Sequence, residues 1–415
     1  MTEPRQPRYS RRRVLTGAAL TGSLAVAGCT SNGADGDDAA DADADRAAVD
    51  DLEDDLLAFP EIEDPPEAVY RPTHRERMVM LEPVFAGDYG FAPMYTYPHP
   101  FWIYTGDLEH HEPTAAEDVH LMVSVWDRET GVVVPIDASV SLELFADGEL
   151  VSSTNGWLMI SQQMGFHFGD NVPLDGDGRY RVDGRIAPLD VRRTGAFEGR
   201  FDEPVEFGFE FEFDRDDLWD LVEGIEYFPE DEWGEPGALE PMDHGDHVHD
   251  DHGHHDDHDD HGDHEHHDDH GDHEHHDDHD VPYSALPSAE DLPGTLQGTP
   301  ESGDAVLATT LLEPGSRFVD GEEWYLAVSP RTPYNRCVLP LMGLEATIGD
   351  ADREPVDLVE TLDHELEYHY GAPLSSVSPG DELTITVRTP PQVSRHQGYE
   401  TAFVEMPDVT LELSP

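Results

Sequence analysis

The sequence predicts an all-β protein with two tandem immunoglobulin-like β-sandwich domains, joined by a disordered, acidic, histidine-rich linker. Three observations lead to this prediction. Apolar and polar residues alternate in short runs within two segments, 67–215 and 302–415, and turn residues separate the runs. About seven such runs in each segment are typical of a sandwich. Between them, residues 216–301 are rich in Asp, Glu, Pro and His, which predicts a linker.

The first 29 residues have the features of an export signal. Consecutive arginines, Arg11 to Arg13, precede an apolar run, Val14 to Ala27, that is too short to cross a bilayer. The arginines resemble a Tat signal, and Val-Ala-Gly-Cys at 26–29 resembles a lipobox. We therefore expect export, cleavage before Cys29 and lipidation of Cys29, which would anchor the protein in the cell membrane, facing outside. An ordinary secretory signal with a chance cysteine is the alternative.

The charge of the chain limits its partners. The 415 residues carry a formal net charge of −69, and the sequence shows no basic patch. Nucleic acid is therefore excluded as a partner, and cations are natural ones. A charge of this size suggests a halophilic protein, because dissolved salt must screen the self-repulsion. Residues 30–66 are also acidic, with little apolar content, and we expect them to form a solvated tether.

Individual strands can be read from the period of two. Residues 205–213 place four phenylalanines on one face, and glutamates and a glycine on the other. Residues 140–144 and 383–387 alternate in the same way. This pattern indicates antiparallel strands that are buried on one side only.

The two segments resemble each other in sequence. The spacing from Leu121 to Pro135 equals that from Leu326 to Pro340, and His167 falls opposite His369. Four later positions match at a constant offset: Gly178, Pro188, Val191 and Arg193 fall opposite Gly380, Pro390, Val393 and Arg395. We interpret the chain as a tandem of two similar sandwiches.

These residues resemble the periplasmic Fe²⁺ transport protein family, immunoglobulin-like domains of bacterial iron-uptake systems. The family's histidine turn resembles residues 165–169 and 367–371, which contain His167 and His369. The family's Arg-His pair resembles Arg395-His396, whereas the first segment has Arg193-Thr194 at that place. The family's methionine is similar to Met159, and the second segment has Leu362 there, with His364 nearby. The resemblance implies a surface site for copper or iron, often in a dimer.

Imidazole nitrogen suits copper, zinc and iron, and a thioether adds a preference for Cu(I). We therefore expect His369 and His396 to converge within the second sandwich, with His364 or a glutamate as a third ligand. In the first sandwich, His167 and Met159 are candidate ligands, although a packed histidine and a core methionine are the alternatives. Four further histidines precede or enter the first segment: His99, His110, His111 and His120. His110 and His111 fit a solvated loop better than a ligand pair.

A second device is predicted in the linker. Sixteen of the 25 histidines lie among aspartates and glutamates in a tract that repeats the unit HGDHEHHDD. Carboxylates concentrate cations, and neutral imidazoles bind them, so the tract is expected to hold several transition-metal ions loosely. The alternative is an acidic spacer. The sixteen candidate ligands are His244, His247, His249, His252, His254, His255, His258, His261, His264, His266, His267, His270, His273, His275, His276 and His279.

The predicted function is therefore that of a surface-anchored protein that binds a transition metal, iron, copper or zinc, and serves its uptake. A metal permease is the expected partner. The alternative is a cell-surface structural or interaction lipoprotein whose histidine tract only buffers zinc. We do not expect an enzyme, because the sequence has no nucleophile elbow, P-loop, zincin or dinucleotide motif.

Overall fold

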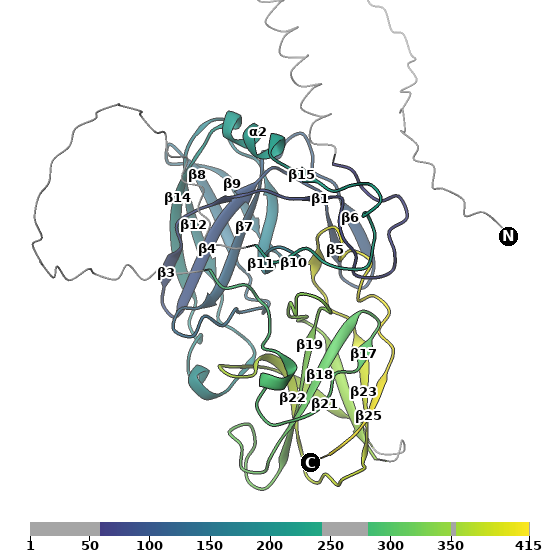
Figure 1. Cartoon of the computed structure of the whole chain (residues 1–415). Coiled ribbons are helices and arrows are strands. Elements are labelled where there is room, and N and C mark those ends of the chain that lie inside the picture. The colour runs from purple at the N-terminus through teal and green to yellow at the C-terminus, as the bar shows by residue number, and fades with distance from the viewer. Residues whose placement is uncertain (1–58, 243–280, 350–353, 415) are drawn as a thin grey trace, which may run out of the picture. The chain divides into compact units, whose positions relative to one another are not determined.

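A computed structural model describes residues 59–242, 281–349 and 354–414. The regular secondary structure of these residues is almost all β, as predicted, and they lie within a single compact unit (Figure 1). None of the helices among them is long and apolar enough to cross a membrane. Cys29 and the sixteen histidines of the tract lie outside the described residues.

A nine-stranded sheet forms one layer of the first sandwich. Its order is β2-β4-β7-β11-β10-β24-β5-β6, and β3 pairs with β4. The strands are β2 (Val79–Met80), β3 (Val84–Ala86), β4 (Tyr89–Thr96), β5 (Phe101–Tyr104), β6 (Leu108–His111), β7 (Val119–Asp127), β10 (Trp157–Ser161), β11 (Gly165–Val172) and β24 (Ser394–Arg395). Most of β4, β7 and β11 is buried, which places these strands in the middle of the core.

A four-stranded sheet, β14-β12-β8-β9, forms the opposite layer. Its strands are β8 (Ser141–Ala146), β9 (Glu149–Asn155), β12 (Gly178–Ile186) and β14 (Val205–Phe213). The four phenylalanines of β14 are buried and its glutamates are exposed, which confirms the predicted alternation. Phe207 stacks on Phe91 of the facing sheet with ring centroids 3.9 Å apart, so aromatic contacts join the layers.

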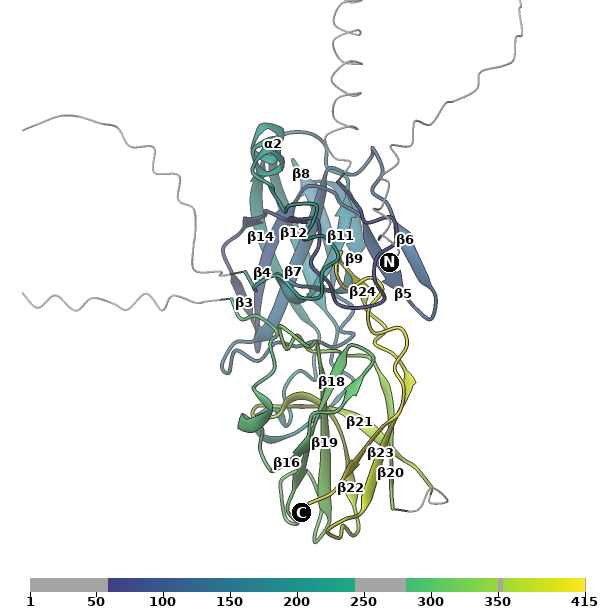
Figure 2. The same ribbon diagram turned by 45° about the vertical axis from the view of Figure 1, so that its right-hand side comes forward.

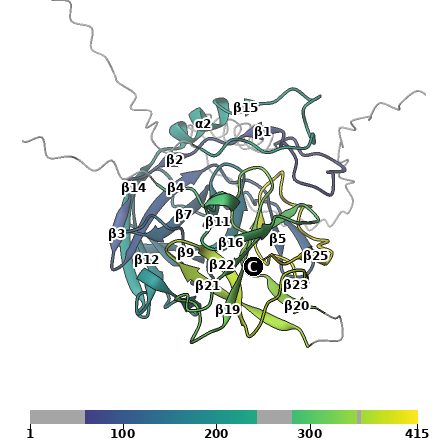
Figure 3. The ribbon, with the colours of Figure 1, turned by 60° about the horizontal axis from the view of Figure 1, so that its bottom comes forward.

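The second sandwich is built from a ten-stranded sheet that curls back on itself like a barrel, β16-β18-β19-β22-β21-β20-β23-β25, seen from below in Figure 3. In addition, β13 pairs with β21 and β17 with β18. The strands are β13 (Arg192–Arg193), β16 (Thr295–Gly298), β17 (Glu301–Ser302), β18 (Ala305–Leu312), β19 (Trp324–Arg331), β20 (Gly343–Ile348), β21 (Val356–Asp363), β22 (Glu367–Leu374), β23 (Glu382–Thr389) and β25 (Val409–Glu412).

Each sandwich gives one short strand to the other. β24, from the second segment, lies between β10 and β5 of the first sheet, and pairs with β10 in parallel. Figure 2 shows β24 close to β5. β13, from the first segment, pairs in parallel with β21 of the second sheet. The order β4-β7-β11-β10-β24 therefore has the same form as β18-β19-β22-β21-β13. The two sandwiches are joined by this exchange, and not by the linker alone.

Both ends of the predicted linker, 216–301, contain helices and strands. Helix α2 (Arg215–Glu223) occupies its start, with Asp214 as N-cap and Leu218, Leu221 and Val222 buried. Next, β15 (Glu226–Tyr227) pairs with β1 (His74–Arg75). At the other end lie the short helix η2 (Ala289–Asp291) and strands β16 and β17; a further short helix, η1 (Gly195–Phe197), follows β13. The acidic composition hid these elements because their acids face solvent while a few apolar residues dock on the core.

Candidate metal centre

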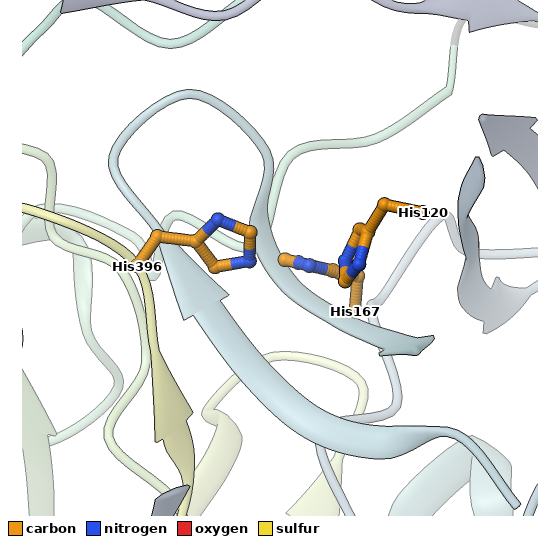
Figure 4. Close-up of side chains that lie close together, drawn as sticks. All are labelled: His120, His167 and His396. Carbon is orange, nitrogen blue, oxygen red and sulfur yellow. The ribbon is translucent and has the colours of Figure 1, made fainter. Parts of the chain in front are cut away.

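Three histidines converge where β24 enters the first sheet. His120 lies on β7, His167 on β11, and His396 directly follows β24; one ligand atom of each lies within 4.8 Å of those of the others. Figure 4 shows the three rings turned toward one another. All three side chains are buried. Imidazole nitrogen binds a metal ion at ~2.1 Å, so nitrogen atoms this close to one another could share one ion.

The backbone fixes the placement of His167. The β10–β11 hairpin turns through Gly165, whose φ of +72° is a left-handed conformation. Across this hairpin, Met159 pairs with His167. The carbonyl of Gly165 lies 3.1 Å from Nδ1 of His167 and can only accept, so the ring proton is on Nδ1. The lone pair of Nε2 is left free for a ligand.

His120 is oriented by an amide. Its Nδ1 lies 2.9 Å from Oδ1 of Asn171, and Nδ2 of Asn171 donates to the carbonyl of His99 over 3.0 Å. The second bond fixes which end of the amide faces His120, so Nδ1 carries the proton here too. Partners of this kind hold metal-binding histidines in one tautomer.

The thioether of Met159 lies close to Nε2 of His120 and is a further possible donor. A Cβ added at Gly169 of β11 would lie 2.9 Å from Nε2 of His120 and 3.1 Å from Sδ of Met159. The glycine therefore leaves room beside both donor atoms. The Nε2 atoms of His120 and His167, and both ring nitrogens of His396, are buried without a hydrogen-bond partner among the described residues. Such orphaned atoms are costly in a folded protein unless a ligand satisfies them.

Burial keeps the imidazoles of His120 and His167 neutral. Burial and the nearby His396 together lower the pKa of His167 to about 3. Burial, with His99 and His396 as neighbours, also holds the pKa of His120 well below its usual value. Near pH 7 both rings therefore present lone pairs without first losing a proton.

The neighbouring residue Arg395, which is buried, holds His396 at the first sandwich. Arg395 pairs with Ile160 of β10, and the amide of His396 donates to the carbonyl of Ile160 over 3.2 Å. The fully buried Arg395 guanidinium lies 4.6 Å from the ring centre of Tyr104 and donates to the carbonyl of Ala402. Burial lowers the pKa of Arg395 to about 10, so it stays charged at neutral pH.

The corresponding place in the second sheet keeps one histidine, His369, and differs at the other donor positions. There β13 replaces β24, and Thr194 stands where His396 stands in the first sheet. Across the hairpin His369 pairs with Thr361, whereas His167 pairs with Met159. The hydroxyl of Tyr325 lies 3.1 Å from Nε2 of His369, and the carbonyl of Glu367 lies 3.1 Å from its Nδ1. Both nitrogens of His369 are therefore satisfied by the protein itself.

The structure thus corrects one expectation and regroups others. His369 and His396 do not converge, because His396 lies beside His167 instead. Among the described residues, neither His369 nor His364 belongs to a group of possible ligands. His364 instead accepts from the amide of Ala196 and lies 3.7 Å from Asp363. His120 was not predicted to be a ligand, although its place as a lone histidine in the apolar run of β7 was a signal.

The comparisons with known proteins cover parts of the chain. Residues 290–412 match the model of a domain of unknown function, DUF7350. No curated protein matches. Among solved structures, a copper-bound variant of FetP from uropathogenic Escherichia coli strain F11 is 25% identical, with a TM-score of 0.28, and the match covers 33% of this chain and 97% of that one. FetP of the same strain as isolated, after expression in the periplasm, is 23% identical, with a TM-score of 0.27 and the same coverage.

Proposed function

We propose that this protein binds one transition-metal ion tightly at His120, His167, His396 and Met159, as a non-catalytic protein of a metal-uptake system. The observation that carries the proposal is the group of buried, unpartnered ring nitrogens that converge beside a thioether. Three imidazoles and one thioether favour Cu(I), and Fe²⁺ or Zn²⁺ are weaker fits, because the thioether is a soft ligand. The donors come from two sandwiches of one chain, so the single chain would hold a complete site.

The rest of the chain fits this role. The signal at 1–29 supports export and a lipid anchor at Cys29, and the net charge of −69 draws cations to the surface. The histidine tract would collect ions loosely outside the tight site. A permease in the same membrane would then receive the ion. The similar order of the two sheets supports an origin by duplication, after which only one copy kept its donors.

His167 and His369 provide a matched pair of variants to test the site. Both are the third residue of their strand, both are fully buried, and both have Nδ1 against a backbone carbonyl. The full chain and its H167Q and H369Q variants are titrated with Cu(I) against a colorimetric chelator, and with Fe²⁺ under anaerobic conditions. We expect the tight ion to be lost in H167Q and kept in H369Q. Equal binding by both variants would refute the proposed site.

A further inference from the structure

A second group of possible ligands adjoins the first and shares one residue with it. Glu76, His99 and His396 each offer a ligand atom within 4.8 Å of the other two. Oε1 of Glu76 lies 3.8 Å from Nδ1 of His396. Nδ1 of His99 lies 3.1 Å from the carbonyl of Pro100, which can only accept, so the free lone pair of His99 is on Nε2. Glu76 follows β1 and His99 follows β4, so these two members come from the start of the first segment, whereas His396 comes from the second.

This group differs from the inner one in chemistry and in access. It contains a carboxylate, which suits divalent cations, and no thioether. The Glu76 side chain keeps 19% of its surface exposed, whereas His120, His167 and Met159 are fully buried.

A small cavity lies beside this group. It has a volume of about 20 Å³, and its walls include His74, Glu76, His396 and Gln163. A space of this size holds a single water molecule or ion. The Nε2 atoms of His74 and His99 are buried and without a partner among the described residues. The cavity therefore meets the group at Glu76 and His396, and unsatisfied nitrogen atoms lie close by.

We propose that Glu76, His99 and His396 form an outer cation position through which the divalent ions that the inner site accepts less tightly than Cu(I), such as Fe²⁺ or Zn²⁺, are loaded into it. This inference rests on the proposed function, because it gives the inner site a route of filling. His396 belongs to both positions, and a neutral imidazole has only one lone pair to offer at a time. An ion held through Nδ1 of His396 leaves the proton on Nε2, so the two positions use His396 in turn. The outer position is therefore a transit position and not a second store.

The test is the rate of loading. The full chain is mixed with Co²⁺ in a stopped-flow instrument at high salt, and the visible ligand-field band of the bound ion is followed. H167Q is run in parallel, and its signal is subtracted as the contribution of all other sites. E76Q keeps the shape of the side chain and removes its charge; E82Q makes the same charge change at an exposed position and is the control.

We expect E76Q to slow loading at least about tenfold relative to E82Q, with the equilibrium affinity for Co²⁺ changed by less than about threefold. Equal rates in E76Q and E82Q would overturn the outer position while leaving the inner site intact. A large loss of equilibrium affinity in E76Q would also overturn it, since Glu76 would then be an inner ligand. If H167Q binds as the unmodified chain does, the proposed function itself fails, which is a separate result.

Discussion

Replacing Gly169 with alanine tests whether the space beside the donor atoms is the metal site. The added methyl carbon would lie 2.9 Å from Nε2 of His120, 3.1 Å from Sδ of Met159 and 3.2 Å from Cγ of Met122. Ordinary contacts of this kind need about 3.5 Å or more, so both donors must move by a few tenths of an ångström. Metal–ligand distances tolerate only about ±0.2 Å. The methyl group therefore displaces at least one donor.

The size of the effect follows from the number of donors. Structural sites with four donors bind their ion by about 10–16 kcal/mol, so each donor contributes about 3 kcal/mol. Losing one donor then weakens binding at least about a hundredfold. The control variant is G298A, because a Cβ added at Gly298 meets no atom nearer than 3.8 Å. G298A is expected to bind as the unmodified chain does.

Affinity is measured by competition with a Cu(I) chelator, and the fold is checked by the unfolding midpoint of the metal-free proteins. If G169A folds and binds Cu(I) as tightly as G298A, the ion does not sit beside Gly169, and the reasoning from the donor geometry is wrong. A lowered midpoint with unchanged affinity would lead to the same conclusion.

Three further outcomes are expected. H396Q loses one donor of four, so its affinity for Cu(I) should fall about a hundredfold in the same competition assay, and an unchanged affinity would remove the second sandwich from the site. M159L keeps the volume but not the sulfur, and should weaken Cu(I) binding by a larger factor than Zn²⁺ binding in parallel titrations; equal losses would argue against a bound thioether. Burial lowers the pKa of His369 to about 4 in the folded protein, so between about pH 6.5 and 4 the unfolded chain binds the extra proton and stability falls as the pH falls. From pH 7 to 5 this histidine should cost about 2 kcal/mol in denaturant titrations of the metal-free protein, and H369Q should lack that part of the pH dependence.

Local patterns in the sequence predicted the strands well. The phenylalanines of β14 and the apolar side chains of β23 lie where the period of two puts them, because each strand has one buried face. This alternation acts over a few residues and is fully visible in the sequence. The turns before His167 and His369 are less visible, because Gly165 suits its positive φ whereas Glu367 adopts a positive φ that its residue type does not signal.

The composition of the metal centre was only partly predictable. His167, Met159 and His396 were candidates, but the sequence paired His396 with His369, because both lie in the second segment. The structure places His396 in the first sheet through a strand of two residues, and no periodicity marks so short an element. Glu76 and His99 carried no signal, since their approach to His396 depends on the packing of distant segments.

The position of β24 in the first sheet would affect how a bound ion leaves the site. An ion bound by His120, His167 and His396 would act as a latch between two parts of the chain that are far apart in sequence, much as a reversible cross-link would. β24 is held at the sheet by only a short strand, so its withdrawal breaks few backbone hydrogen bonds. Withdrawal of residues 394–396 would therefore separate His396 from His120 and His167 and open the latch.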